Sequence, residues 1–161
     1  MKRTLRSAAI KAILAPTDLS PGSLSGVIRA AEFAHRFQAN LILMTAVPKP
    51  RATAEQHGRY LDQAADTVRM QLASWFARQV PAAVRQGLSV RFLAVVGTPV
   101  PTILQVAKTE GIDLIVMVTR GRSGLRQLLD RSVAEGVVRV SPSPVLTIRT
   151  DGTPARTIAV A

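Results

Sequence analysis

The chain has 161 residues, a length that fits one domain burying roughly two thirds of the surface that its unfolded form exposes. It has no cysteine, and its two histidines, His35 and His57, are widely separated. This excludes a disulfide scaffold, thiol catalysis and a zinc-type ligand spacing. The net charge of +11 favours anionic partners, whereas an aromatic content of 4% argues against a single-strand binder that stacks bases.

The N-terminal residues 1–6 are basic, and the apolar run behind them is interrupted by Lys11. A membrane span needs about 18 consecutive apolar residues, and no window of the sequence comes near that length. We therefore expect a soluble, cytoplasmic protein. We expect residues 1–150 to form a single α/β domain that opens with a basic arm, residues 1–8, and residues 151–161 to form a C-terminal tail.

Apolar runs bounded by turn residues predict five strands, and apolar residues repeating every three or four positions predict four helices between them. The expected strands are residues 12–15, 41–44, 89–96, 114–118 and 145–148. The apolar faces of the helices begin at Leu24, Leu61, Val100 and Val133, and we expect the helices to end near Asn40, Pro81, Gly111 and Ser141. The alternation predicts a parallel sheet covered on both faces, with right-handed crossovers.

In an open parallel sheet, ligands bind beyond the carboxyl ends of the strands, where the strand order reverses. Two loops of this chain carry suitable groups at that edge. Asp18 follows the first strand, and it either accepts from a ribose hydroxyl or an adenine amine or caps a helix that begins near Ser20 or Ser23. Gly121 and Gly124 follow the fourth strand, and they either let a phosphate reach backbone N–H groups or form a turn.

No nucleophile, base and orienting group share a recognisable spacing, so we expect no enzyme and assign no catalytic or metal-binding residue. Weak ATP hydrolysis stays open, because phosphoryl transfer needs mainly positioning and charge. His35, on the first helix, fits a surface or packed histidine better than a general base. Met44, Met70 and Met117 lie in apolar stretches and are expected in the core.

Three short motifs stand at the ends of predicted strands or before them. The first strand leads to Pro-Thr-Asp-Leu-Ser at 16–20, the third to Gly-Thr-Pro at 97–99, and the last follows Ser-Pro-Ser-Pro at 141–144. Their order resembles that of the universal stress protein family. The family's fourth strand ends in a loop of the form Gly-x-x-Gly, nine residues, Gly-Ser/Thr. The resemblance spans roughly residues 8 to 150. It implies an open five-stranded parallel sheet flanked by helices on both faces, Rossmann-like and similar to the adenine nucleotide alpha hydrolases.

Members of that family that bind nucleotides cradle ATP phosphates with the three glycines and the Ser or Thr of this loop, and another branch lacks them. Matched position by position, this chain has Val118 and Arg131 at the first and third glycines and keeps Gly121 and Ser132. The resemblance implies ATP as the candidate cofactor. It places the candidate nucleotide or anion site at Pro16, Asp18, Ala46, Gly97, Gly121, Arg131 and Ser132.

The two replaced glycines predict that ATP is not held in the usual mode, because β-branched Val118 and bulky Arg131 crowd the backbone that would meet the phosphates. The leading interpretation is a regulatory domain that acts through protein contacts. Alternatively Arg131, with Arg120, Arg122 and Arg126, holds phosphate through guanidinium groups, which makes the domain an ATP- or anion-binding switch. Arg122 and Arg126 equally fit a solvated face.

Ser132 also has two interpretations. It is either a hydroxyl partner of the phosphates or the N-cap of the last helix, with Glu135 completing a capping box. The sequence leaves both open.

The family resemblance also implies a homodimer through the last strand, Val145 to Ile148, and an unidentified protein partner. An exposed edge strand is a ready template for such pairing. A competing interpretation rests on charge alone: a basic exterior, led by Lys2, Arg3, Arg6 and Lys11, binds nucleic acid or an anionic membrane.

Overall fold

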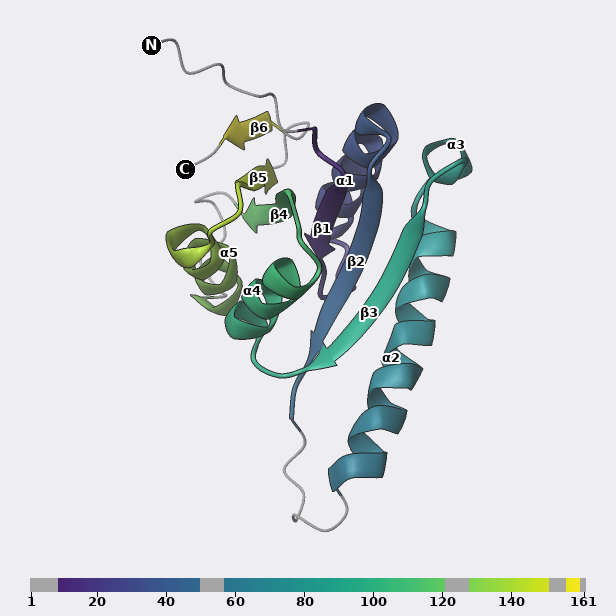
Figure 1. Cartoon of the computed structure of the whole chain (residues 1–161), viewed down its shortest axis with the longest axis vertical. Coiled ribbons are helices and arrows are strands. Elements are labelled where there is room, and N and C mark those ends of the chain that lie inside the picture. The colour runs from purple at the N-terminus through teal and green to yellow at the C-terminus, as the bar shows by residue number, and fades with distance from the viewer. Residues whose placement is uncertain (1–8, 50–56, 121–127, 151–155, 160–161) are drawn as a thin grey trace.

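The computed structural model describes residues 9–49, 57–120, 128–150 and 156–159, in which strands alternate with helices except that α3 follows α2 and β6 follows β5 (Figure 1). The strands are β1 (Ala12–Pro16), β2 (Asn40–Val47), β3 (Val90–Val96), β4 (Leu114–Arg120), β5 (Val145–Thr150) and β6 (Arg156–Ala159). The helices are α1 (Leu24–Phe37), α2 (His57–Gln79), α3 (Ala82–Arg85), α4 (Pro99–Thr109) and α5 (Leu128–Val140).

The strands form one sheet in the order β3-β2-β1-β4-β5-β6. The first five are parallel, which confirms the expected α/β architecture, and β6 joins the edge of β5 antiparallel, which the sequence analysis did not predict. The strand order reverses between β1 and β4. These two strands pair only at Ile13–Leu114 and Leu14–Ile115, and β1 ends at Pro16, which has no N–H to donate. They therefore part toward their carboxyl ends.

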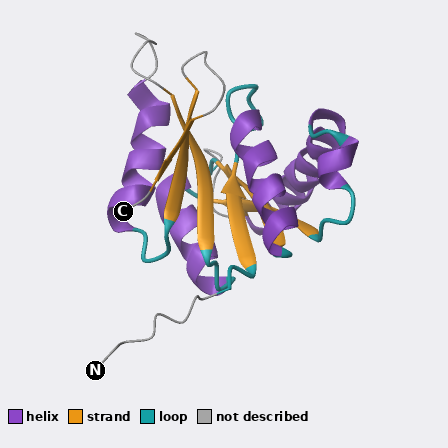
Figure 2. Ribbon diagram, turned by 90° about the horizontal axis from the view of Figure 1, so that it is seen from above, coloured by secondary structure: helices purple, strands orange, loops and turns teal. Residues whose placement is uncertain are grey.

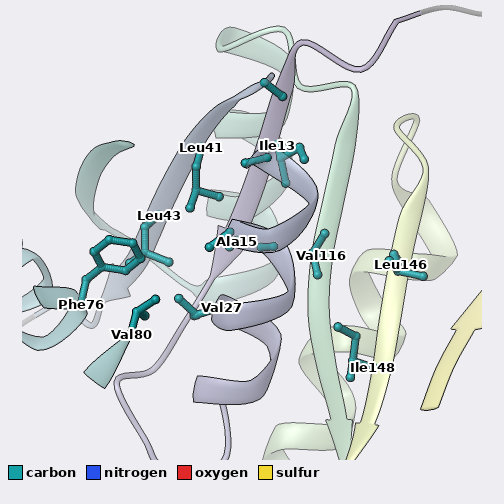
Figure 3. Close-up of a cluster of buried hydrophobic side chains, with 14 of the residues drawn as sticks. Ile13, Ala15, Val27, Leu41, Leu43, Phe76, Val80, Val116, Leu146 and Ile148 are labelled. Atoms are coloured by element: carbon teal, nitrogen blue, oxygen red, sulfur yellow. The ribbon is translucent and has the colours of Figure 1, made fainter. Parts of the chain in front are cut away.

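Helices cover both faces of the sheet (Figure 2). Alternate residues of a strand point to opposite faces, so each strand feeds two cores. On one face, side chains of the inner strands pack with residues of α1 and α2 (Figure 3). The strands contribute Ile13, Leu41, Leu43 and Val116, and the helices and the residue after α2 contribute Val27, Phe76 and Val80. On the other face the strands pack with α4 and α5; the core there includes Leu14, Ile42, Met44, Ile115, Ile103 and Val137.

The end of α1 differs from the expectation. The helix stops at Phe37 and not near Asn40, because Gln38 takes the left-handed conformation, with φ 53°, and its N–H donates to the carbonyls of Ala34 and His35. Asn40 instead opens β2, where its N–H donates to the carbonyl of Lys11 over 2.8 Å.

Two expectations for helical residues are wrong. The helix α5 begins at Leu128, so Ser132 lies inside it and is not its N-cap. Met70 is 67% exposed, because α2 turns the face that carries Leu72 and Phe76 toward the sheet. The core placement of Met44 and Met117 is confirmed, and His35, expected either on the surface or packed, is exposed. The short helix α3 was not predicted.

A contact between Gly26 and Val118 sets how closely α1 lies on β4. An ideal Cβ built on Gly26 would stand 2.4 Å from Cγ2 of Val118, far inside van der Waals contact. Gly26 is buried in the first turn of the helix, where alanine would still be the better helix former. Position 26 therefore lacks a side chain so that α1 can pack over the valine.

This contact predicts a non-additive pair of substitutions. Gly26→Ala is expected to destabilise the protein by about 1–3 kcal/mol through overpacking, although the same change in a free helix would stabilise it by up to about 1 kcal/mol. In a Val118→Ala background, which lacks the opposing methyl, Gly26→Ala should be neutral or stabilising. Urea unfolding of the wild type, both single variants and the double variant measures the coupling, and additive effects would contradict the contact.

Candidate functional site

A cavity of about 190 Å³ opens at the carboxyl ends of β1, β2 and β4, where β1 and β4 part. Its walls come from these strand ends, from the loop that follows β1, and from α4 and α5. The lining residues are Pro16, Thr17, Asp18, Ser20, Gly22, Ser23, Thr45, Ala46, Pro99, Ile103, Met117, Val118, Val133 and Ala134. The cavity therefore lies at the switch point of the sheet, where such folds bind ligands.

The loop between β1 and α1 is held by its own hydroxyl groups. The Oγ1 of Thr17 and the Oγ of Ser23 lie 2.7 Å apart, and the N–H of Leu19 donates to that Oγ1 over 3.1 Å. The Oγ of Ser23 donates to the carbonyl of Ser20 over 2.9 Å, and the N–H of Thr17 donates to the carbonyl of Met44. These bonds fix one wall of the cavity in advance of any ligand.

Asp18 presents its carboxylate at the cavity rim. Its Oδ1 accepts from the N–H of Ser20 over 3.0 Å, which closes a local turn. It does not cap α1, because that helix begins at Leu24, with Ser23 as N-cap, so the capping interpretation is wrong. Burial raises the pKa of the Asp18 carboxyl, but hydrogen bonds from Ser20 and Ser23 outweigh this and hold the pKa below its ordinary value of 3.8. The group is therefore an anion at neutral pH, with lone pairs to spare for a ligand's hydroxyl.

The opposite side of the cavity is mostly apolar. Ile103 from α4 and Val133 from α5 face the strand ends that carry Ala46, Met117 and Val118. Such a pairing of an apolar wall with a few fixed polar groups is the usual make-up of a small-molecule site.

The structure separates the residues that the resemblance grouped together. Pro16, Asp18 and Ala46 line the cavity, but Gly97 does not. The N–H of Gly97 donates to the carbonyl of Val47 over 2.9 Å, and a Cβ on it would stand 2.4 Å from Oγ1 of Thr102. Gly97 therefore serves the tight turn from β3 into α4.

The remaining predicted residues belong to the segment around the start of α5. Gly121, with Arg122, Gly124 and Arg126, lies outside the described residues. Arg131 and Ser132 have helical backbone, but their side chains, like that of Arg120, are outside the described part. The next residues of α5, Val133 and Ala134, line the cavity, so this helix does reach the site.

The basic arm led by Lys2, Arg3 and Arg6 also lies outside the described residues, whereas Lys11 is described and exposed. Within the described part of the chain, no cluster of His, Cys, Asp and Glu residues is suited to hold a metal ion. No helix there combines the length and hydropathy needed to cross a membrane.

Several lining residues escaped the sequence analysis for different reasons. Thr45 directly follows an apolar strand run, so the rule that pointed to Asp18 would also have found it. The sequence indicates Ser23 only as the start of a helix, because its bond to Thr17 depends on how the loop folds. Ile103 and Val133 belong to apolar helix faces, and no sequence signal separates a cavity wall from a core position.

The family model described as the universal stress protein family matches residues 9–149 of this chain. Universal stress protein MJ0531 of Methanocaldococcus jannaschii is 28% identical over 140 residues, which cover 86% of this chain and 82% of that protein. Universal stress protein MJ0577 of the same organism is 38% identical, but over 63 residues that span only 39% of each chain.

Solved structures share the fold across most of the chain. A universal stress protein in complex with cAMP superposes with a TM-score of 0.68 at 26% identity, covering 89% of this chain and all of that one (100%). UspA from Lactobacillus plantarum gives a TM-score of 0.67 at 26% identity, covering 88% and 99% of the two chains. The motif order and the five parallel strands agree with the family-model match over residues 9–149. The chain therefore belongs to the universal stress protein family.

Proposed function

We propose that this protein is a regulatory binding domain that holds the nucleoside part of an adenine nucleotide and does not grip the triphosphate of ATP in the family's usual mode. In this proposal the domain acts as a homodimer joined along β5. The observation that carries the ligand assignment is the cavity at the switch point, with a fixed polar wall on one side and an apolar wall on the other.

The cavity suits a nucleoside because its two walls match the two kinds of surface that a nucleoside has. The apolar side, with Ile103 and Met117, offers a surface for the faces of a base. The carboxylate of Asp18 offers an acceptor for ribose hydroxyls, and its surrounding loop is already ordered by internal hydrogen bonds. A pre-ordered site loses less conformational entropy on binding. The related universal stress protein that binds cAMP, at 26% identity, supports an adenine nucleotide as the ligand class.

The phosphate end has a different character. Val118 lines the cavity at a position where a glycine would leave backbone N–H groups accessible, and its methyl is packed against Gly26. Asp18 is the one titratable side chain among the described lining residues, and its negative charge repels a phosphate placed beside it. Neither feature favours an anion cradle of main-chain donors.

The same residues support binding over catalysis. General acid–base chemistry needs two groups with separate roles, and the described lining residues supply Asp18 and several hydroxyls. The depressed pKa of Asp18 makes it a weak proton acceptor at neutral pH, so it suits holding a ligand better than moving its protons.

The first prediction compares nucleotides that differ in phosphate number. Isothermal titration of the nucleotide-stripped protein should give AMP and ATP–magnesium dissociation constants within about threefold, because the β- and γ-phosphates add few contacts. In the Val118→Gly/Arg131→Gly variant the affinity for ATP should rise at least about tenfold, since each charge-assisted hydrogen bond regained contributes about 1.5–3 kcal/mol.

A matched control variant has the same two types of substitution, valine to glycine and arginine to glycine, at positions that do not line the cavity. Val96→Gly/Arg139→Gly alters the end of β3 and an exposed position of α5, and it should leave both affinities unchanged. Circular dichroism checks that each variant is folded. ATP binding to the wild type more than tenfold tighter than AMP would contradict the proposal and favour a phosphate site rebuilt from arginines.

The second prediction concerns Asp18. Asp18→Asn keeps an oxygen to accept from Ser20 but removes the charge, so AMP affinity should fall about tenfold or more. Because the pKa of Asp18 is lowered, the carboxylate stays ionised down to below pH 3.8, and its contribution to binding should be constant between pH 5 and 8. Titrations at several pH values measure both effects, with Asp62→Asn on the exposed surface of α2 as control. Equal affinities of wild type and Asp18→Asn would place the ribose elsewhere.

A further inference from the structure

The hydroxyl groups on the described wall of the cavity differ in how their hydrogens are used. They belong to Thr17, Ser20, Ser23 and Thr45. A hydroxyl has one hydrogen to donate and two lone pairs that can accept. A ligand can therefore receive a hydrogen bond only from a hydroxyl whose hydrogen the protein does not already use.

The loop between β1 and α1 uses the hydrogens of its own three hydroxyls. The Oγ of Ser23 donates to the carbonyl of Ser20 over 2.9 Å, so in the 2.7 Å contact between Ser23 and Thr17 the threonine is the donor. The Ser20 side chain is hydrogen-bonded to the carboxylate of Asp18, which can only accept, and this bond is one cause of the lowered pKa of Asp18. The loop therefore offers a ligand acceptors and no free hydroxyl hydrogen.

Thr45 differs from these three residues. It is 6% exposed, and its hydroxyl makes no hydrogen bond with any described residue. Buried hydroxyls in proteins are nearly always hydrogen-bonded. Among the described side chains, only the oxygen of Ser25 is both sealed from solvent and without a partner, so the Thr45 oxygen is open to the cavity that this residue lines.

The sheet fixes where Thr45 stands. The N–H of Thr17 donates to the carbonyl of Met44 over 2.8 Å, which carries the Pro16–Met44 register on to Thr17 and Thr45. Residues two apart on a strand share a face, so Thr45 lies on the same face as Leu43, which α1 covers. The two threonines therefore stand side by side in the polar wall, one bonded and one free.

We propose that Thr45 is a specificity-determining residue of the cavity, whose hydroxyl donates a hydrogen bond to an acceptor nitrogen of the purine ring. The inference deepens the proposed function and rests on its adenine nucleotide. Ribose hydroxyls can donate to Asp18 at the rim, whereas the ring nitrogens N1, N3 and N7 accept and need a donor. Among the described lining side chains, Thr45 is the one that supplies a free donor hydrogen.

Substitutions of Thr45 test the contact by isothermal titration with AMP. Thr45→Val removes the hydroxyl and keeps the branched shape, so the affinity for AMP should fall about tenfold through the loss of one hydrogen bond. Thr45→Ser keeps the donor and should stay within about threefold of the wild type. The matched control is Thr67→Val on the exposed surface of α2, which should leave the affinity unchanged.

AMP analogues in which carbon replaces N1, N3 or N7 identify the acceptor. One of the three should bind the wild type about tenfold more weakly than AMP does. That analogue should lose nothing further in Thr45→Val, because the same hydrogen bond is missing from both sides. If Thr45→Val weakens all three analogues as much as it weakens AMP, the hydroxyl does not meet the ring and the proposal is wrong.

The ligand-free protein gives an independent readout. Because the Thr45 hydroxyl has no partner among the described residues, Thr45→Val should leave the urea midpoint of unfolding unchanged or raise it. Thr17→Val, at a hydroxyl bonded to Ser23 and to the N–H of Leu19, should lower that midpoint. An equal decrease in both variants would show that the Thr45 hydroxyl is bonded within the protein and would overturn the proposal.

The inference and the proposed function fail in different ways. Wild-type binding of AMP that Thr45→Val does not change overturns the role of Thr45 and leaves the nucleotide assignment in place. No binding of AMP by the wild type overturns both.

Discussion

The separation of β1 from β4 is the constraint on which the candidate site depends. The chain crosses to opposite faces of the sheet after these two strands, so neither α1 nor the described part of α5 fills the space between their carboxyl ends. Pairing stops after Leu14 and Ile115, and Pro16 cannot extend it. The cavity is thus a consequence of the strand order and of Pro16, which has no N–H. The side chains that line the cavity determine only which ligand binds there.

Most of the fold follows from hydrophobic periodicity, and the errors occur where periodicity carries no information. The apolar runs at 41–44 and 114–118 are short and bounded by turn residues, which is typical of buried strands, and both are strands in the structure. The end of α1 depends on the left-handed Gln38, a conformation that the helical pattern does not encode. β6 is a four-residue strand whose order depends on pairing with β5, and local sequence reports such long-range pairing poorly.

The sequence could predict those site residues that lie at or just after the carboxyl end of a parallel strand. Asp18 follows the first strand and was expected at the carboxyl edge, whereas Ala46 was assigned to the site by the family resemblance; both line the cavity. The hydroxyl bond between Thr17 and Ser23, and the choice of Ile103 as a wall, depend on how a loop and two helices meet in space. Gly97, which the resemblance grouped with the site, lies outside the cavity lining and packs in a turn against Thr102, and the sequence motif does not distinguish these two positions.

The valine at position 118, where the family motif has a glycine, has to be interpreted together with its contact with α1. Val118 fills the space above Gly26, so a glycine at 118 alone would leave a void against a buried helix, and an alanine at 26 alone would collide with the valine. Two packings satisfy both positions: valine over glycine, or a small residue on β4 facing a side chain on α1. A small residue at position 118 exposes the backbone of β4 to a phosphate, and a side chain at position 26 then fills the space that the valine leaves. Because the helix contact and the anion contact compete for the same atoms, the choice of ligand in this domain is coupled to the packing of its first helix.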